Sequence, residues 1–117
     1  MKDNPILEKS FTFALRIVRL YRYLIEEKKD YILSKELLIS GTHIGKHIKE
    51  AVDAESRQVF ISEMGIARRK ASETEYWLQL LFQSDLLTEK QFVSIEADRE
   101  EIFKLLTSIV KTSKENV

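Results

Sequence analysis

Two histidines and a glutamate in the stretch "ISGTHIGKHIKEA", residues 39–51, are spaced as metal ligands on a helix would be. His47 follows His43 by four residues and Glu50 follows by three more, so all three side chains can share one helical face. Zinc and nickel accept two imidazoles and a carboxylate. A structural zinc site needs four ligands, however, and the chain lacks the Glu-x-x-His pairs of di-iron bundles. We therefore expect polar residues at a helix rim, with no metal and no cofactor.

A second group with possible chemistry is cationic. Its members are Lys9, Arg16, Arg19, Arg68, Arg69 and Lys70. Phosphate binding depends on local cation density, so such residues, repeated around an oligomer, could form a basic belt that binds RNA or DNA. The alternative is that they lie on ordinary solvated helix faces, where Arg68 pairs with Glu75 and Arg69 with Glu73.

Glu73 and Glu75 lie next to Tyr76 and Trp77. A carboxyl group buried beside aromatic rings is a candidate acid with a shifted pKa. The competing interpretation is that Glu73 pairs with a backbone group or an arginine and fixes the register of an oligomer. The chain shows no Ser-His-Asp arrangement, no glycine loop for phosphates and no catalytic carboxylate pair. We therefore predict that it is not an enzyme and has no catalytic residue.

Composition limits the class of protein. The 117 residues fit one domain, and one proline with three glycines argues against a turn-rich β fold. The chain has 19 basic and 19 acidic residues, so net charge offers no support for a nucleic-acid partner. It has no cysteine, and neither a signal-like segment nor an apolar run of membrane-spanning length occurs. We expect a soluble cytoplasmic protein with no membrane partner.

Apolar periodicity predicts four helices, separated by short polar breaks. Their expected ranges are 5–28, 31–53, 56–83 and 88–113, within a single domain spanning 1–117. Ser56 and Thr88 are suited to cap the third and fourth helices. Helices of similar length joined by short loops predict an all-α fold, an antiparallel up-and-down four-helix bundle.

The first and third helices carry more apolar surface than a lone bundle covers. In the first, we expect the core to be made by Leu7, Phe11, Ala14, Leu15, Val18, Tyr21 and Ile25. In the third, we expect it to be made by Phe60, Met64, Ala67, Ala71, Leu78 and Leu81. The remaining apolar residues are candidates for an oligomer interface, chiefly Ile17, Leu20, Leu24, Ile66, Trp77 and Leu80. The alternative is an imperfect bundle with a few exposed leucines.

Gly41 and Gly45 occupy the packing face of the second predicted helix, where each glycine costs about 1 kcal/mol relative to alanine. With Ser34 they form a smooth strip that another helix backbone can approach closely. A broken or bulged helix at "SGT" is the competing interpretation.

The stretch "SGTHIGKHIKEA", followed by "FISEMGIARRKASETEYWLQLL", resembles the four-helix-bundle family encoded in intervening sequences of bacterial 23S rRNA genes. The signature falls on Ser40, Gly41, Thr42, Ile44, Gly45, Glu50, Ala51, Phe60, Ile61, Ile66, Ala67, Glu73, Tyr76, Trp77 and Leu78. Lys46, His47 and Lys49 depart from it, so a shared polar function is least safely carried over there.

This resemblance implies a bundle that assembles into a ring, as a homopentamer. The chain is also similar to the accessory variability proteins of diversity-generating retroelements, which are basic pentamers that bind nucleic acid and a reverse transcriptase. The resemblance therefore adds RNA or DNA, and a nucleic-acid enzyme, as candidate partners. The neutral charge favours a different function, a structural or protein-binding assembly with no nucleic-acid contact.

Overall fold

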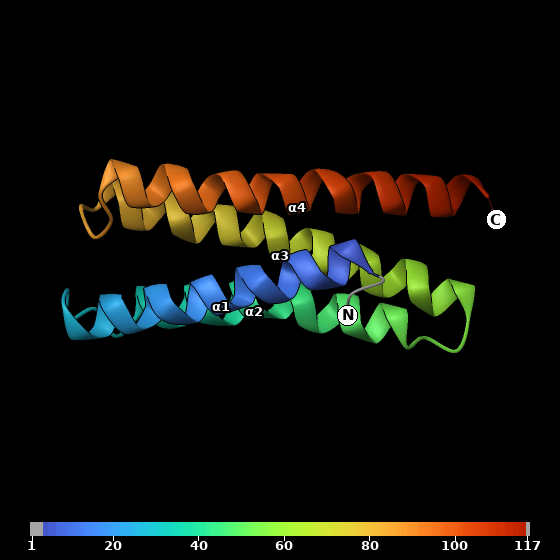
Figure 1. Ribbon diagram of the computed structural model, residues 1–117, viewed down its shortest axis with the longest axis horizontal. Helices are drawn as coiled ribbons and strands as arrows, with labels where there is room; N and C mark the ends of the chain where they lie inside the picture. Colours follow the sequence, from blue (N-terminus) through green and yellow to red (C-terminus); the bar gives the residue numbers. More distant parts are fainter. Residues whose placement is uncertain (1–3, 117) are drawn as a thin grey trace.

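The chain folds into four successive helices, as seen in a computed structural model that describes residues 4–116. They are α1 (Pro5–Glu26), α2 (Leu33–Val52), α3 (Arg57–Gln83) and α4 (Glu89–Glu115). The described residues contain no strand, which confirms the all-α prediction. Each helix runs antiparallel to the one before it, and the bundle measures 47 × 24 × 20 Å (Figure 1).

Side-chain caps fix where three helices begin. Asn4 and Ser56 accept hydrogen bonds from the backbone N–H groups of Leu7 and Val59. Thr88 and Gln91 form a reciprocal capping box at the start of α4. Ser56 and Thr88 therefore cap their helices as predicted.

The second helix begins two residues later than expected because of Asp30. Its carboxylate accepts a hydrogen bond from the backbone N–H of Ser34 at 2.6 Å, and its backbone carbonyl accepts one from the Ser34 hydroxyl at 2.7 Å. These bonds stabilise the first turn of α2, so residues 31 and 32 remain outside the helix and expose their side chains.

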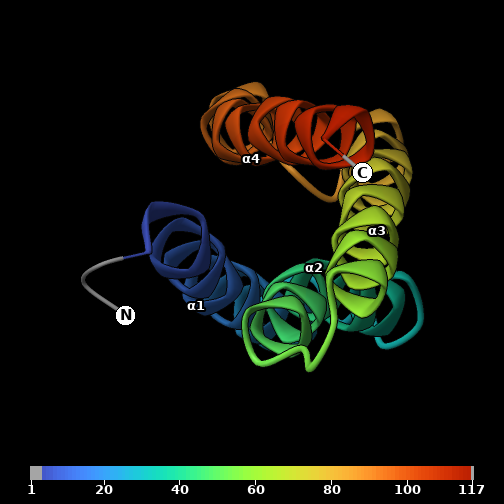
Figure 2. The same ribbon diagram turned by 90° about the vertical axis from the view of Figure 1, so that its right-hand side faces the viewer.

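The four helices lie around the bundle in chain order, α1, α2, α3 and α4 (Figure 2). Three neighbouring pairs pack extensively, whereas α1 and α4 touch over a much smaller area. The bundle is consequently least tightly closed along the side where α1 faces α4. Helices α3 and α4 have 27 residues each, against 22 and 20 for α1 and α2, so the predicted similarity of lengths is only approximate.

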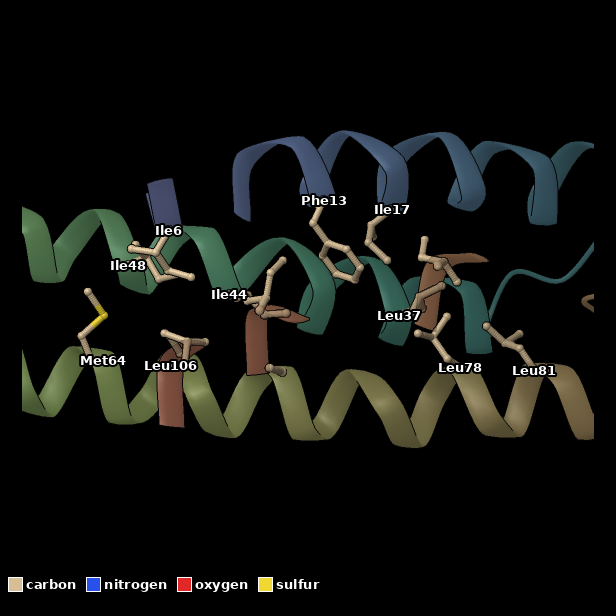
Figure 3. Close-up of a cluster of buried hydrophobic side chains, with 14 of the residues drawn as sticks. Ile6, Phe13, Ile17, Leu37, Ile44, Ile48, Met64, Leu78, Leu81 and Leu106 are labelled. Carbon is tan, nitrogen blue, oxygen red and sulfur yellow. The ribbon is translucent and has the colours of Figure 1, made fainter. Parts of the chain in front are cut away.

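The core contradicts the predicted orientation of α1. Phe13, Ile17 and Leu24 are buried among side chains from the other helices (Figure 3 labels the first two), whereas Phe11 and Leu15 are 49% and 42% exposed. The two apolar bands of α1 lie side by side, and helical periodicity alone does not decide which of them faces inward. For α3 the prediction holds better, since five of the expected core residues are buried: Met64, Ala67, Ala71, Leu78 and Leu81.

Gly41 determines how closely α1 approaches α2. A Cβ atom placed on Gly41 would lie 2.8 Å from Cγ1 of Ile17, a side chain with no exposed surface. At Gly45 the corresponding contacts, with the carbonyl oxygen and Oγ of Ser10, are an acceptable 3.4 Å. Helix α2 continues without a break through both glycines, so the bulged helix is wrong. The Gly41 distance supports close packing at that position, whereas Gly45 makes an ordinary contact.

We predict that Gly41→Ala lowers the free energy of unfolding by about 1–3 kcal/mol, because the new methyl group overlaps Ile17. Gly65→Ala is the matched control, since a Cβ there meets nothing within 4 Å. That change should raise the free energy of unfolding by about 0.5–1 kcal/mol through helix propensity. Urea unfolding at one fixed protein concentration measures both. A Gly41→Ala protein as stable as wild type would contradict the close-packing account.

Candidate functional site

Of the two histidines, His47 contacts another helix, and its partner is Glu63 where the sequence suggested Glu50. His47 Nδ1 lies 2.7 Å from a carboxylate oxygen of Glu63 on α3, and the ring centroids of His43 and His47 are 6.1 Å apart. Glu50 is exposed to solvent on α2. Across residues 4–116, no three His, Cys, Asp or Glu side chains come together as a metal site requires. His47 and Glu63 thus link α2 to α3.

The six predicted cations do not form one basic face within the subunit. Lys9 pairs with Glu101 at 3.1 Å, and Arg16 with Asp98 at 2.5 Å; both pairs join α1 to α4. Lys70 lies 3.4 Å from Glu73 on its own helix. These three cations therefore have carboxylate partners inside the chain.

Of the remaining three cations, Arg68 is also engaged. Its Nε donates to the Thr107 hydroxyl at 2.8 Å, and its guanidinium lies 4.7 Å from the centroid of the Phe103 ring. Arg19 and Arg69 are exposed, and neither has an ion-pair partner within residues 4–116. The predicted pairs Arg68–Glu75 and Arg69–Glu73 are wrong, because Arg99 and Lys70 occupy those carboxylates.

Arg99 is a buried cation that the sequence interpretation missed. It lies on the apolar face of α4, with a side chain only 4% exposed, and pairs with Glu96 at 2.6 Å and Glu75 at 3.1 Å. It also donates to the backbone carbonyl of Ala71 on α3. Burial disfavours its charge, yet the bonds and charges of Glu96 and Glu75 outweigh this and raise the pKa of Arg99. Arg99 therefore joins α3 and α4.

The predicted acidic site beside the aromatic residues is not buried. The side chains of Glu73 and Glu75 are each 46% exposed, and each has a cationic partner. Tyr76 is 61% exposed and lies edge-on to Trp77, with ring centroids 5.0 Å apart. The two glutamates therefore contribute salt bridges within the subunit. The partner of Glu73 is a lysine of its own helix, in place of the arginine or backbone group that the alternative interpretation expected.

The predicted oligomer interface needs correction. Ile17 and Leu24 have no exposed surface, so the structure contradicts their assignment to a contact with another subunit. Leu20 and Trp77 pack against the core with part of their surface exposed. Ile66 and Leu80 are partly buried as well. The interface prediction failed at Ile17 and Leu24 for the same reason as the core prediction. The sequence interpretation assigned the inward-facing band of α1 to the surface and the outward-facing band to the core.

Between α1 and α2 the surface has an apolar hollow of about 370 Å³. Its walls are Leu7, Ser10, Phe11, Ala14, Thr42, Gly45, Lys46 and Lys49. Phe11 and Leu15, one turn apart on α1, stay substantially exposed, and Phe11 also lines the hollow. We call Leu7, Phe11, Ala14, Leu15 and Val18 the outer band of α1.

Two further hollows lie where α1 faces α4, and their charges differ. One, of about 400 Å³, contains three carboxylates and one lysine: Glu8, Asp98, Glu101 and Lys9. The other, of about 460 Å³, is lined by Arg16, Arg19, Leu20, Tyr23, Lys90, Gln91, Ser94 and Ile95. We call this second one the basic hollow. Lys90 escaped sequence reasoning because it lies 71 residues from Arg19, and only folding brings them together.

The fold and these surfaces define a small four-helix protein, and comparison with known proteins identifies its family. A sequence profile described as "23S rRNA-intervening sequence protein" matches residues 2–108. The chain belongs to this family. No curated protein matches it. No helix within residues 4–116 is long and apolar enough to cross a bilayer.

A solved structure is similar over nearly the whole chain. It is the crystal structure of a protein of unknown function from the S23 ribosomal protein family of Bacteroides thetaiotaomicron VPI-5482. The two sequences are 49% identical, and the match covers 91% of this chain and 98% of the other, with a TM-score of 0.89.

His43 predicts a pH-dependent stability. Partial burial lowers the pKa of His43 below 6.5, the charges of Lys46, Lys70 and His47 lower it further, and Glu73 opposes them. The unfolded chain therefore binds a proton more readily, so stability is fully present above about pH 6.5 and falls as the pH drops towards the folded pKa. Between pH 7.5 and 5.5, the urea midpoint should fall more for wild type than for His43→Gln. Parallel pH profiles would contradict this.

Proposed function

We propose that the chain is a non-enzymatic scaffold whose bundles self-associate through the outer band of α1. A single observation carries this proposal. Phe11 and Leu15 remain 49% and 42% exposed, beside an apolar hollow, although Phe13, Ile17 and Leu24 of the same helix are buried. Adjacent exposed apolar side chains beside a hollow are typical of interaction surfaces.

The chemistry of this surface fits a second copy of the chain. The hollow between α1 and α2 contains no carboxylate, and Lys46 and Lys49 are its only charged members. Lys49 already pairs with Asp53 at 2.6 Å, so a partner face that is apolar and places a carboxylate near Lys46 would complement the hollow. Association would remove from water the part of Phe11 and Leu15 that folding leaves exposed, contributing about 1–2 kcal/mol for each side chain.

A ring of five subunits is the assembly that the family resemblance implies. In a ring, each subunit contributes two different faces to its neighbours, so the outer band of one copy would contact another face of the next. A role without catalysis is supported by the engagement of the titratable groups: Arg99, Glu75, Glu96, His47 and Glu63 all pair between or within helices.

Binding of RNA or DNA, alone or together with a nucleic-acid enzyme, is the second candidate function. The expected belt of six cations has little support, because four of them are engaged inside the subunit. The observation that favours this candidate is the basic hollow, which gathers Arg16, Arg19 and Lys90 in one place.

We predict that the double variant Phe11→Ser, Leu15→Ser dissociates the assembly while keeping its helix content. Ile17→Glu is unsuitable as a test, because it would place a charge in the core. Val93→Ser is the control, since Val93 is a 57% exposed apolar residue on α4. Light scattering after size-exclusion chromatography gives the mass of each protein, and circular dichroism gives its helix content. The wild type should be measured at about 100 μM, a concentration well above the Kd of a stable oligomer. A monomeric wild type at that concentration would contradict the scaffold proposal, and so would a double variant that stays fully assembled.

A further inference from the structure

The basic hollow concentrates positive charge in a chain whose net charge is zero. Its eight lining residues include three cations and no carboxylate, whereas the chain as a whole contains 19 basic and 19 acidic residues. Cations that converge from two helices raise the local positive potential even when net charge is zero. Anions are thus favoured at the basic hollow, whereas the other hollow between α1 and α4 holds Glu8 and a Glu101 carboxylate already paired with Lys9.

Arg16 is held in a defined position at the hollow. Its guanidinium bonds the Asp98 carboxylate at 2.5 Å, the Ser94 hydroxyl at 2.9 Å and the Ser94 carbonyl at 3.3 Å. These contacts span from α1 to α4 and orient the guanidinium before any ligand arrives. Asp98 also neutralises part of the charge of Arg16, so the excess positive charge of the hollow comes mainly from its other two cations.

Those two cations, Arg19 and Lys90, come from opposite sides of the hollow. Arg19 lies on α1 and Lys90 in the first turn of α4, and both are exposed. Neither has an ion-pair partner within residues 4–116. An anion between them would receive hydrogen bonds from a planar guanidinium on one side and a mobile ammonium on the other.

The rest of the lining suits an organic group attached to that anion. Leu20 and Ile95 contribute apolar atoms to the lining, and Tyr23 contributes a hydroxyl. Gln91 and Ser94 already accept bonds from the Thr88 backbone and Arg16, which leaves the Gln91 amide N–H groups and the Ser94 O–H as donors. The volume of about 460 Å³ is within the usual range for small-ligand sites. Phosphate esters combine these features, because a charged phosphate is attached to a less polar sugar or base.

We propose that the basic hollow binds the phosphate of a nucleotide unit, with Arg19 and Lys90 contacting the phosphate from α1 and α4. The nucleotide can be free or part of an RNA strand, since both carry the same phosphate ester. This site does not depend on the outer band of α1, so the hollow and the assembly surface can be tested separately.

The test uses two probes on the full chain, whose mass is checked by light scattering. Calorimetry measures binding of ADP, and fluorescence anisotropy measures binding of a labelled 12-nucleotide poly-uridine RNA, both at about 50 mM salt where phosphate contacts are strong. The test variant is Arg19→Ala, Lys90→Ala. The matched control is Arg22→Ala, Lys35→Ala, which removes two exposed cations outside the hollow.

We expect the test variant to raise the Kd at least roughly tenfold, the usual effect of losing charge-assisted hydrogen bonds, while the control stays close to wild type. If ADP binds and the test variant weakens its binding by at least roughly tenfold, the ligand is a free nucleotide. If only the RNA binds, and the test variant weakens its binding, the ligand is an RNA strand. The slope of log K against log salt should then become shallower by about 0.7 for each phosphate that the variant no longer neutralises. No binding of either probe, or equal weakening in the test and control variants, would overturn the proposal.

Discussion

The contact between Ile17 and Gly41 is the constraint on which the arrangement of α1 depends. Because Gly41 has no side chain, Ile17 packs directly against the α2 backbone and is completely buried. This contact turns the band of Phe13, Ile17 and Leu24 towards the core. The outer band is then left at the surface, with Phe11 and Leu15 substantially exposed. The same orientation directs Arg16 and Arg19 towards α4, where they line the basic hollow.

Charged residues complete the packing that the apolar core begins. On the less closed side of the bundle, Lys9–Glu101 and Arg16–Asp98 connect α1 to α4. Arg99 joins α4 to α3 from within the core, and His47 joins α2 to α3 through Glu63. Several cations therefore pair with groups on neighbouring helices. Fewer cations remain to bind a partner of this neutral subunit. Arg19 and Lys90 of the basic hollow are exposed and hold no helices together through an ion pair, so their charges stay available to a ligand.

The sequence predicted what local chemistry determines. Apolar periodicity indicated the four helices, and hydroxyl side chains marked the starts of α3 and α4 at Ser56 and Thr88. The glycines of α2 correctly indicated a close helix contact. Which band of α1 faces inward was predicted wrongly, because two adjacent apolar bands have the same period and only the partner helix distinguishes them. The convergence of Lys90 with Arg19 depends on residues distant in the chain, so no local pattern could have revealed it. The burial of Arg99 had a local signal, because helical spacing places it between Ile95 and Ile102 on the apolar stripe, but its charge led us to pass over it.

The most direct test of this account is the reactivity of single thiols on α1, which is practicable because the chain has no cysteine. Ile17→Cys and Phe11→Cys would be labelled without denaturant over a range of protein concentrations. The account predicts that the thiol at position 17 stays unreactive at every concentration. The thiol at position 11 should react rapidly in dilute protein and more slowly as association covers the outer band. A thiol at position 17 that reacts as fast as the one at position 11 would contradict the account, because α1 would then not be held with Ile17 against Gly41.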